Sequence, residues 1–253
     1  MSRRSYEPAI PASTSYFAVS RAPRYSILFA LPLLIVYEAL AVLLSVDRGV
    51  TLRNGAEVLL RGLFTVVFGR NGSLIFFAVV ILFGVWFVAR DLKRNRGGLR
   101  PTVFLAMLVE SAVLAFAFGF VVSKLTAQIL GAMHLQASGQ ISDPDGPTRL
   151  MLSLGAGLYE ELFFRVILVS AIAAAARIWL GMSNRMAGVI ATLIGALVFS
   201  AFHYVGPYGD PFQLRSFAFR AISGVVFSAL YLFRGFGITA WTHALYDVFL
   251  LVF

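Results

Sequence analysis

Three short groups of polar residues interrupt the hydrophobic second half of the chain, and their side chains could carry out chemistry together. One group has two adjacent glutamates with an arginine four residues beyond the second, and each of the other groups contains a histidine. The groups are Glu160-Glu161 with Arg165, then His203, then His243 with Asp247. Carboxylates and imidazoles are the side chains that most often move protons in enzymes. The sequence therefore predicts general acid–base hydrolysis.

The two adjacent glutamates are expected to have different roles. Glu161 and Arg165 are four residues apart, so on a helix they share a face and can form an ion pair. For this pair alone we favour a structural role, in which the ion pair holds helices together. Glu160 is rotated by about 100° from its neighbour and has no partner of its own on that helix. Because membranes rarely keep unpaired acids, Glu160 is predicted to be catalytic.

The histidines complete the predicted site. His203 ends a segment that is otherwise uncharged, and taken alone it could equally be an interfacial residue or a helix cap. Asp247 lies one turn after His243 and can hold that imidazole in one tautomer, although a purely stabilising polar pair is the alternative. In the combined site, Glu160 would take a proton from a water molecule that His203 also holds. His243 would donate to the developing oxyanion.

These residues lie in segments that could cross a membrane. Hydrophobic residues make up 59% of the 253 residues and charged residues only 13%, about half the share typical of a soluble domain. A helix needs about 20 residues to cross the hydrocarbon core. The segments that meet this need are 26–46, 73–89, 102–130, 150–176, 186–205, 213–233 and 236–253. The predicted fold is an all-α polytopic transmembrane bundle of seven or eight spans with a buried polar site.

Orientation is predicted from the basic segments. Residues 55–69 are short and carry two charged residues, which favours an interfacial or re-entrant helix over an eighth span. If they do not cross, the basic tail 1–25 and the basic linker 90–100 lie on the same, cytoplasmic, side. The loops 131–149 and 206–212 then lie outside. We expect a multi-pass protein of the cell (inner) membrane with a cytoplasmic N-terminus.

Charge and composition also limit which partners the protein can have. The formal net charge of +9 is carried by short basic segments between apolar runs, which indicates contact with anionic lipid rather than binding of nucleic acid. The chain has no cysteine, so disulfides and thiol catalysis are excluded. The expected partners are the lipid bilayer and a membrane-protein or lipid-anchored peptide substrate. The preferred mechanism needs neither a cofactor nor a metal.

The order and spacing of the polar groups resemble those of the CAAX protease and bacteriocin-processing (CPBP, or Abi) family. The motifs are Glu-Glu-x-x-x-Arg at 160–165, Phe-x-x-x-His at 199–203 and His-x-x-x-Asp at 243–247. The resemblance covers about residues 148–251. The domain organisation that we predict is a cytoplasmic tail at 1–25, N-terminal membrane helices and loops at 26–147, and a peptidase core at 148–253.

The resemblance implies an intramembrane glutamic endopeptidase that processes or sorts prenylated or membrane-anchored proteins near their C-termini. The catalytic positions correspond to Glu160, His203, His243 and Asp247, and the supporting positions to Glu161, Arg165 and Phe199. Better-known members have asparagine where this chain has Asp247. An ionised aspartate cannot donate to an oxyanion. We therefore expect Asp247 to act by orienting His243.

Three alternatives stay open from the sequence. A zinc-dependent membrane peptidase could use Glu160, His203 and His243 as ligands, although the chain has no His-Glu-x-x-His motif. A proton-coupled transporter would predict inverted repeats, and none is visible. A non-catalytic scaffold or immunity protein should tolerate Glu160→Gln, whereas a peptidase should not.

Overall fold

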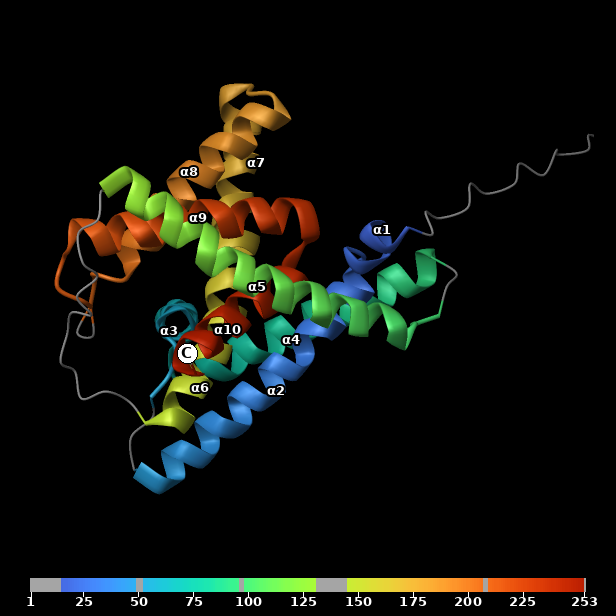
Figure 1. Cartoon of the computed structure of the whole chain (residues 1–253). Helices are drawn as coiled ribbons and strands as arrows, with labels where there is room; N and C mark the ends of the chain where they lie inside the picture. Colours follow the sequence, from blue (N-terminus) through green and yellow to red (C-terminus); the bar gives the residue numbers. More distant parts are fainter. Residues whose placement is uncertain (1–14, 49–51, 96–97, 131–144, 207–208, 253) are drawn as a thin grey trace, which may run out of the picture.

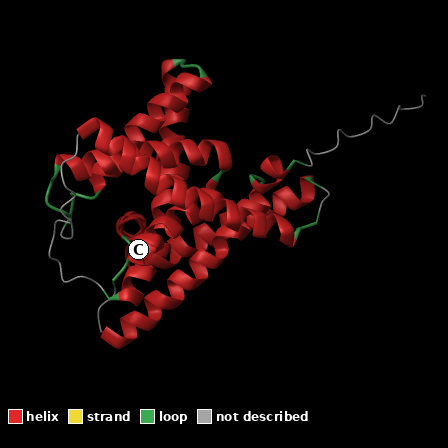
Figure 2. Ribbon diagram, in the orientation of Figure 1, coloured by secondary structure: helices red, strands yellow, loops and turns green. Residues whose placement is uncertain are grey.

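The computed structural model describes residues 15–48, 52–95, 98–130, 145–206 and 209–252, and every regular element among them is a helix (Figures 1 and 2). The elements are α1 (Tyr16–Ser20), α2 (Pro23–Arg48), α3 (Gly55–Phe68), the 3₁₀ turn η1 (Gly69–Asn71), α4 (Gly72–Arg94), α5 (Pro101–Leu130), α6 (Gly146–Gly155), the π-helix η2 (Ala156–Val169), α7 (Ser170–Leu180), α8 (Asn184–Phe202), α9 (Leu214–Arg234) and α10 (Phe236–Val252). The predicted all-α polytopic bundle is confirmed.

Six helical stretches of the described chain are long and apolar enough to cross a membrane. They are Pro23–Val46, Gly55–Arg94, Pro101–Ile129, Gly146–Leu180, Asn184–Phe202 and Leu214–Arg234. Each overlaps one of the first six spans predicted from hydropathy. Their outer faces carry exposed large apolar side chains such as Leu43, Val66 and Trp179, which is the surface that lipid would cover.

The seventh predicted span, 236–253, forms the 17-residue helix α10. At 1.5 Å per residue it is about 26 Å long, shorter than the hydrocarbon core of about 30 Å. It packs against α2, α5, α6, α9 and η2, and it lies near the centre of Figure 1. Its apolar residues pack against these helices, and six longer stretches of the described chain are candidate spans where seven or eight spans were predicted.

Residues 55–69 form the short helix α3, followed after η1 by α4. With 14 residues α3 is about 21 Å long, too short to span the hydrocarbon core alone. A Cβ atom at Gly72 would lie 2.4 Å from the Thr65 backbone, so only glycine lets α4 begin against the last turn of α3. In Figure 1, α3 is seen nearly end-on whereas α4 runs across the view. The apolar stretch is therefore bent, and an interfacial place for α3 stays a prediction.

The largest hydrophobic core cluster joins the N-terminal helices to η2 and α10. It includes Leu33 and Tyr37 of α2, Leu60 of α3, Phe76 of α4 and Tyr159 of η2, all buried. The Tyr159 ring contacts the Tyr37 ring edge-on, with 5.3 Å between their centroids. This cluster fixes the first half of the chain against the segment that carries the paired glutamates.

Small residues let the helices of the second half approach closely, as is usual in membranes. A Cβ atom at Gly157 would lie 2.4 Å from the carbonyl oxygen of Ala240 and 2.6 Å from Cβ of Ala244, so η2 and α10 touch at their backbones. A Cβ atom at Gly224 would lie 2.8 Å from Cα of Ala196, which joins α9 to α8 in the same way. The first of these contacts brings Glu161 of η2 close to His243 of α10.

Candidate active site

The Glu-Glu-x-x-x-Arg motif lies within the π-helix η2, Ala156–Val169. A π-helix closes its hydrogen bonds over one more residue than an α-helix, and such turns occur frequently at functional sites. The expected angle of about 100° between Glu160 and Glu161 assumed α-helical geometry and so does not hold here. Both side chains are nevertheless buried, Glu161 completely.

Glu161 bridges two of the predicted site residues. Its Oε2 lies 3.2 Å from Nε of Arg165, and its Oε1 lies 2.7 Å from Nδ1 of His243. Asp247 lies on the other side of the imidazole, with Oδ2 3.7 Å from Nε2, too far for a hydrogen bond. The short contact that orients His243 therefore comes from Glu161, whereas the sequence had suggested Asp247 for this role.

The guanidinium of Arg165 is held by aromatic rings as well as by Glu161. Its Cζ lies 4.4 Å from the Phe199 ring centroid and 5.5 Å from that of Phe227, within the range of cation–π attraction. The Phe227 ring also stacks on the His243 imidazole at 4.4 Å. Phe227 was not predicted, because a phenylalanine on an apolar helix carries no sequence signal for a site. Phe199 and Phe227 together fix the positions of Arg165 and His243.

His203 follows the last residue of α8, and its tautomer is set by the helix end. Its Nδ1 lies 2.8 Å from the carbonyl oxygen of Phe199. A carbonyl can only accept, so Nδ1 carries the proton and donates it. Nε2 of the neutral ring is then a free acceptor. The backbone N–H of Asp210 donates to the His203 carbonyl at 2.9 Å, which ties the following loop to the same point.

Glu160 lies among the other charged groups of the second half. The residue is 9% exposed, and its carboxylate interacts electrostatically with both His203 and His243. Asp247 interacts in the same way with His243 and with both glutamates. Within the described residues Glu160 forms no hydrogen bond to either imidazole. Its carboxylate instead accepts a hydrogen bond from Nδ2 of Asn54, at 3.0 Å from Oε1.

The residue Asn54 was missed by the sequence reasoning. It lies just before α3, and 106 residues separate it from Glu160. Asparagine before a helix is a common capping residue, so nothing in the sequence marked it as part of a site. The expectation that Glu160 has no partner holds for its own helix but not for the folded chain.

The structure also bears on metal binding. Among the described residues, no three histidine, cysteine, aspartate or glutamate side chains are arranged so that they could hold a metal ion. Glu160, His203 and His243 interact electrostatically but do not form the ligand set that the zinc alternative requires.

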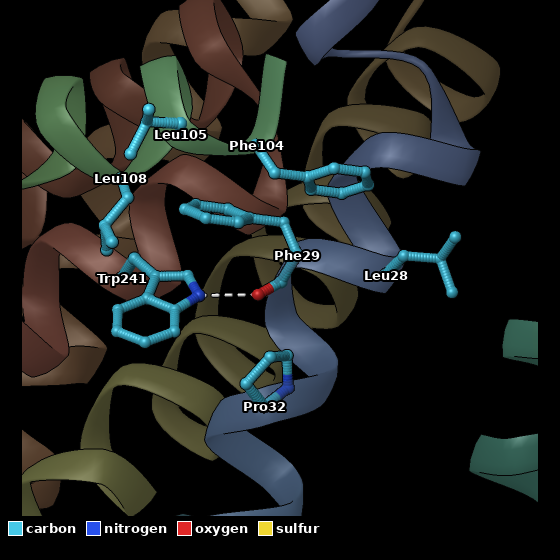
Figure 3. A pocket seen from close by; sticks show the side chains of 7 residues that line it. All are labelled: Leu28, Phe29, Pro32, Phe104, Leu105, Leu108 and Trp241. Atoms are coloured by element: carbon cyan, nitrogen blue, oxygen red, sulfur yellow. Dashed lines mark hydrogen bonds between the residues drawn. The ribbon is translucent and has the colours of Figure 1, made fainter. Parts of the chain in front are cut away.

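An apolar pocket of about 600 Å³ lies apart from these residues, between α2, α5 and α10 (Figure 3). Its lining is Leu28, Phe29, Pro32, Phe104, Leu105, Leu108 and Trp241. Pro32 has no N–H and interrupts the hydrogen bonds of α2, and nearby the indole N–H of Trp241 donates to the Phe29 carbonyl at 2.5 Å. The lining of this pocket contains no carboxylate and no imidazole, so it holds none of the predicted site residues.

The fold is that of a multi-pass membrane protein, and a cluster of carboxylate and imidazole side chains is buried among its helices. Residues 146–249 match the family model of the Rce1-like type II CAAX prenyl endopeptidases. The resemblance to the CAAX protease and bacteriocin-processing family is thereby confirmed for this segment of the chain. No curated protein and no solved structure matches the chain significantly. The domain match supports intramembrane endopeptidase activity in general.

Proposed function

We propose that the chain is an intramembrane glutamic endopeptidase in which Glu160 activates water to hydrolyse a peptide bond of a membrane-associated protein. The observation that carries this proposal is the position of the buried Glu160 carboxylate. It lies within electrostatic range of His203, which follows α8, and of His243 on α10. One acid and two imidazoles from separate helices are what acid–base hydrolysis of an amide needs.

In the proposed first step a water molecule lies between Glu160 and His203. The water donates one hydrogen bond to the Glu160 carboxylate and the other to Nε2 of His203, which is an acceptor because Nδ1 donates to the Phe199 carbonyl. Glu160 takes the proton as the water oxygen bonds to the scissile carbonyl carbon. Glu160 then gives this proton to the leaving amine as the carbon–nitrogen bond breaks, so the carboxylate is regenerated.

His243 supports the oxyanion that forms in this step. Its ring has a carboxylate beside each nitrogen, Glu161 at 2.7 Å from Nδ1 and Asp247 at 3.7 Å from Nε2. Two flanking carboxylates favour a ring that carries both protons, and the longer distance to Asp247 leaves the Nε2 proton available to a third atom. Nε2 can therefore donate to the carbonyl oxygen as negative charge develops on it.

The proposed substrates are prenylated or otherwise membrane-anchored proteins that are cut near their C-termini. The family description and the position of the site among apolar helices support this class. The test compares membrane proteomes of cells that carry the natural chain or Glu160→Gln, and uncleaved precursors should accumulate only with the variant. Identical proteomes under conditions in which both chains are produced would overturn the proposal.

Metal chelators are expected to leave the activity unchanged. The proposed mechanism uses only side chains, and the described residues assemble no metal-ligand set. The measurement is the cleavage rate of purified protein after incubation with EDTA and with 1,10-phenanthroline. A zinc peptidase treated in parallel is the control that shows the chelation works. Loss of activity that added zinc restores would establish the metallopeptidase alternative instead.

We further propose that the N-terminus is cytoplasmic and that the loop after His203 faces outward. If each of the six apolar stretches crosses once, the basic linker at 90–100 returns to the side of the N-terminus, as the positive-inside rule requires. Val205 is exposed, and residues 207–208 of the same loop lie outside the described residues.

Labelling of Val205→Cys is expected from the outer side only. The natural chain has no cysteine, so the signal comes from this one position. A membrane-impermeant maleimide should react in sealed right-side-out vesicles as fully as after permeabilisation. Reaction only after permeabilisation would reverse the proposed orientation.

A further inference from the structure

We infer that Asn54, which lies outside the segment that matches the protease family, is a positioning residue for Glu160. The inference rests on the proposed role of Glu160 as the base. The observation behind it is the hydrogen bond of 3.0 Å from Nδ2 of Asn54 to Oε1 of Glu160. Asn54 is buried, with 6% of its surface exposed. The N-terminal half of the chain would thus contribute directly to the active site.

The orientation of the Asn54 amide is fixed by its second function as the N-cap of α3. Its Oδ1 accepts a hydrogen bond of 2.9 Å from the backbone N–H of Ala56. An amide nitrogen cannot accept that proton, so Oδ1 must face the helix and Nδ2 must face Glu160. The cap therefore presents a donor, and never an acceptor, to the carboxylate.

A donor in this position has two consequences for a general base. It fixes one oxygen of the Glu160 carboxylate, so Oε2 is left to take the proton from water. It also stabilises the ionised carboxylate, which is the form that can act as a base. Both consequences depend on the donor and not on the capping bond.

Asn54 is itself held by its backbone. Its N–H donates to the hydroxyl of Tyr37 at 3.0 Å, and that hydroxyl donates in turn to the buried carboxylate of Glu57. A Cβ atom at Gly155 would lie 2.5 Å from Cε2 of Tyr37 and 3.0 Å from Cβ of Asn54. Glycine at this position therefore permits the close approach that brings Asn54 to η2.

A charge network on α2 and α3 anchors this arrangement. Glu57 lies 3.2 Å from Arg53 and 2.5 Å from Arg61, and Arg53 also bonds Glu38 at 2.7 Å. Burial disfavours the charged form of Arg53, but the hydrogen bond to Glu38 and the charge of Glu57 outweigh it and raise the pKa of Arg53. The start of α3 is thus fixed by ion pairs rather than by apolar packing alone.

Capping by itself does not require asparagine at this position. Aspartate and serine cap helices as well as asparagine does, and the described chain uses Asp145 before α6 and Ser183 before α8. Aspartate has no donor, and the serine hydroxyl lies one bond closer to the backbone than an amide nitrogen. Asparagine combines an acceptor for the helix with an N–H donor that reaches further, toward the carboxylate. The site thus uses the property that distinguishes Asn54 from the other caps.

The test uses Asn54→Asp and Asn54→Ser, which both keep a capping oxygen. Aspartate has no donor, and the serine hydroxyl is one bond shorter than the amide, so it cannot take the place of Nδ2 at Glu160. We expect kcat to fall by about 10–100-fold with little change in KM, because a misplaced base slows the chemical step. In Asn54→Asp the acidic limb of the pH–rate profile should move to higher pH, because a second carboxylate opposes ionisation of Glu160. Asn54→Asp leaves the other charged groups that interact with Glu160 unchanged. These groups are Arg165, His203, His243 and Asp247.

Ser183→Ala is the matched control, because it removes a capping side chain at α8 without touching a charged group of the site. It should keep the natural kcat and pH profile, with at most a lower Tm. Glu160→Gln is measured in parallel. The inference would be overturned if Asn54→Ser kept the natural kcat and pH profile. It would also be overturned if its activity fell only in step with its Tm, as in Ser183→Ala. In either case an inactive Glu160→Gln would leave the proposed function intact. Full activity of Glu160→Gln would overturn the proposed function itself.

Discussion

Replacement of Glu160 by glutamine is expected to abolish peptide-bond cleavage and to leave the protein folded in the membrane. Glutamine has nearly the same volume and can still accept the hydrogen bond from Asn54, so the helix packing around it should persist. It cannot take a proton from water. A missing general base typically costs about 10²–10⁴-fold, so kcat should fall by at least this factor. The measurement is kcat of the purified variant, with Tm as the test of folding.

The same substitution at another acid within the apolar helices is the control. Glu110 of α5 is paired with Arg234 at 2.6 Å and bonds the hydroxyl of Tyr16, and it belongs to no part of the proposed site. Glu110→Gln should therefore cleave substrate at the natural rate, although its Tm can fall. Equal activity of the two variants would show that Glu160 is not the base.

The fold was predictable because lipid constrains it strongly. A bilayer accepts few structures other than apolar helices, so hydropathy located every stretch that the structure shows to be long enough to cross. Hydropathy did not show that α10 packs against α2, α5, α6, α9 and η2, because burial among helices and exposure to lipid both favour apolar residues. The 17 residues of α10 lie at the lower limit of what a membrane span needs.

The candidate site could be predicted from the sequence as a set of residue types but not as a set of contacts. Intramembrane charges are costly, so Glu160, His203 and His243 stood out against apolar helices. The contacts of Glu161 with His243 and of Asn54 with Glu160 join residues 82 and 106 positions apart, and no periodicity encodes such pairs. They depend on close helix approaches at single glycines, which a sequence displays without revealing what they touch.

Removal of the His243 imidazole is expected to cost far more activity than neutralisation of Asp247. His243→Ala removes the donor to the oxyanion, and loss of one such donor typically lowers kcat by about 10²–10³-fold. Asp247→Asn leaves the 2.7 Å contact of Nδ1 with Glu161 in place, so the ring keeps its orientation. Its loss should be about 10-fold, the lower end of what removal of an outer partner costs. The measurement is kcat of both variants with one substrate at one pH.

The contrast between these two variants separates the roles of the carboxylates on either side of the ring. Glu161→Gln removes the charge at Nδ1, so its activity should fall toward that of His243→Ala, with a loss of stability because Arg165 is left without its ion pair. Tm measured beside kcat distinguishes the two effects. The opposite result is an Asp247→Asn variant as inactive as His243→Ala, together with a nearly fully active Glu161→Gln. It would show that the contact at Nε2 orients the ring, and that Asp247 or another group stabilises the oxyanion. Intermediate activity of Asp247→Asn together with severe loss in Glu161→Gln is the result that the 2.7 Å and 3.7 Å distances predict.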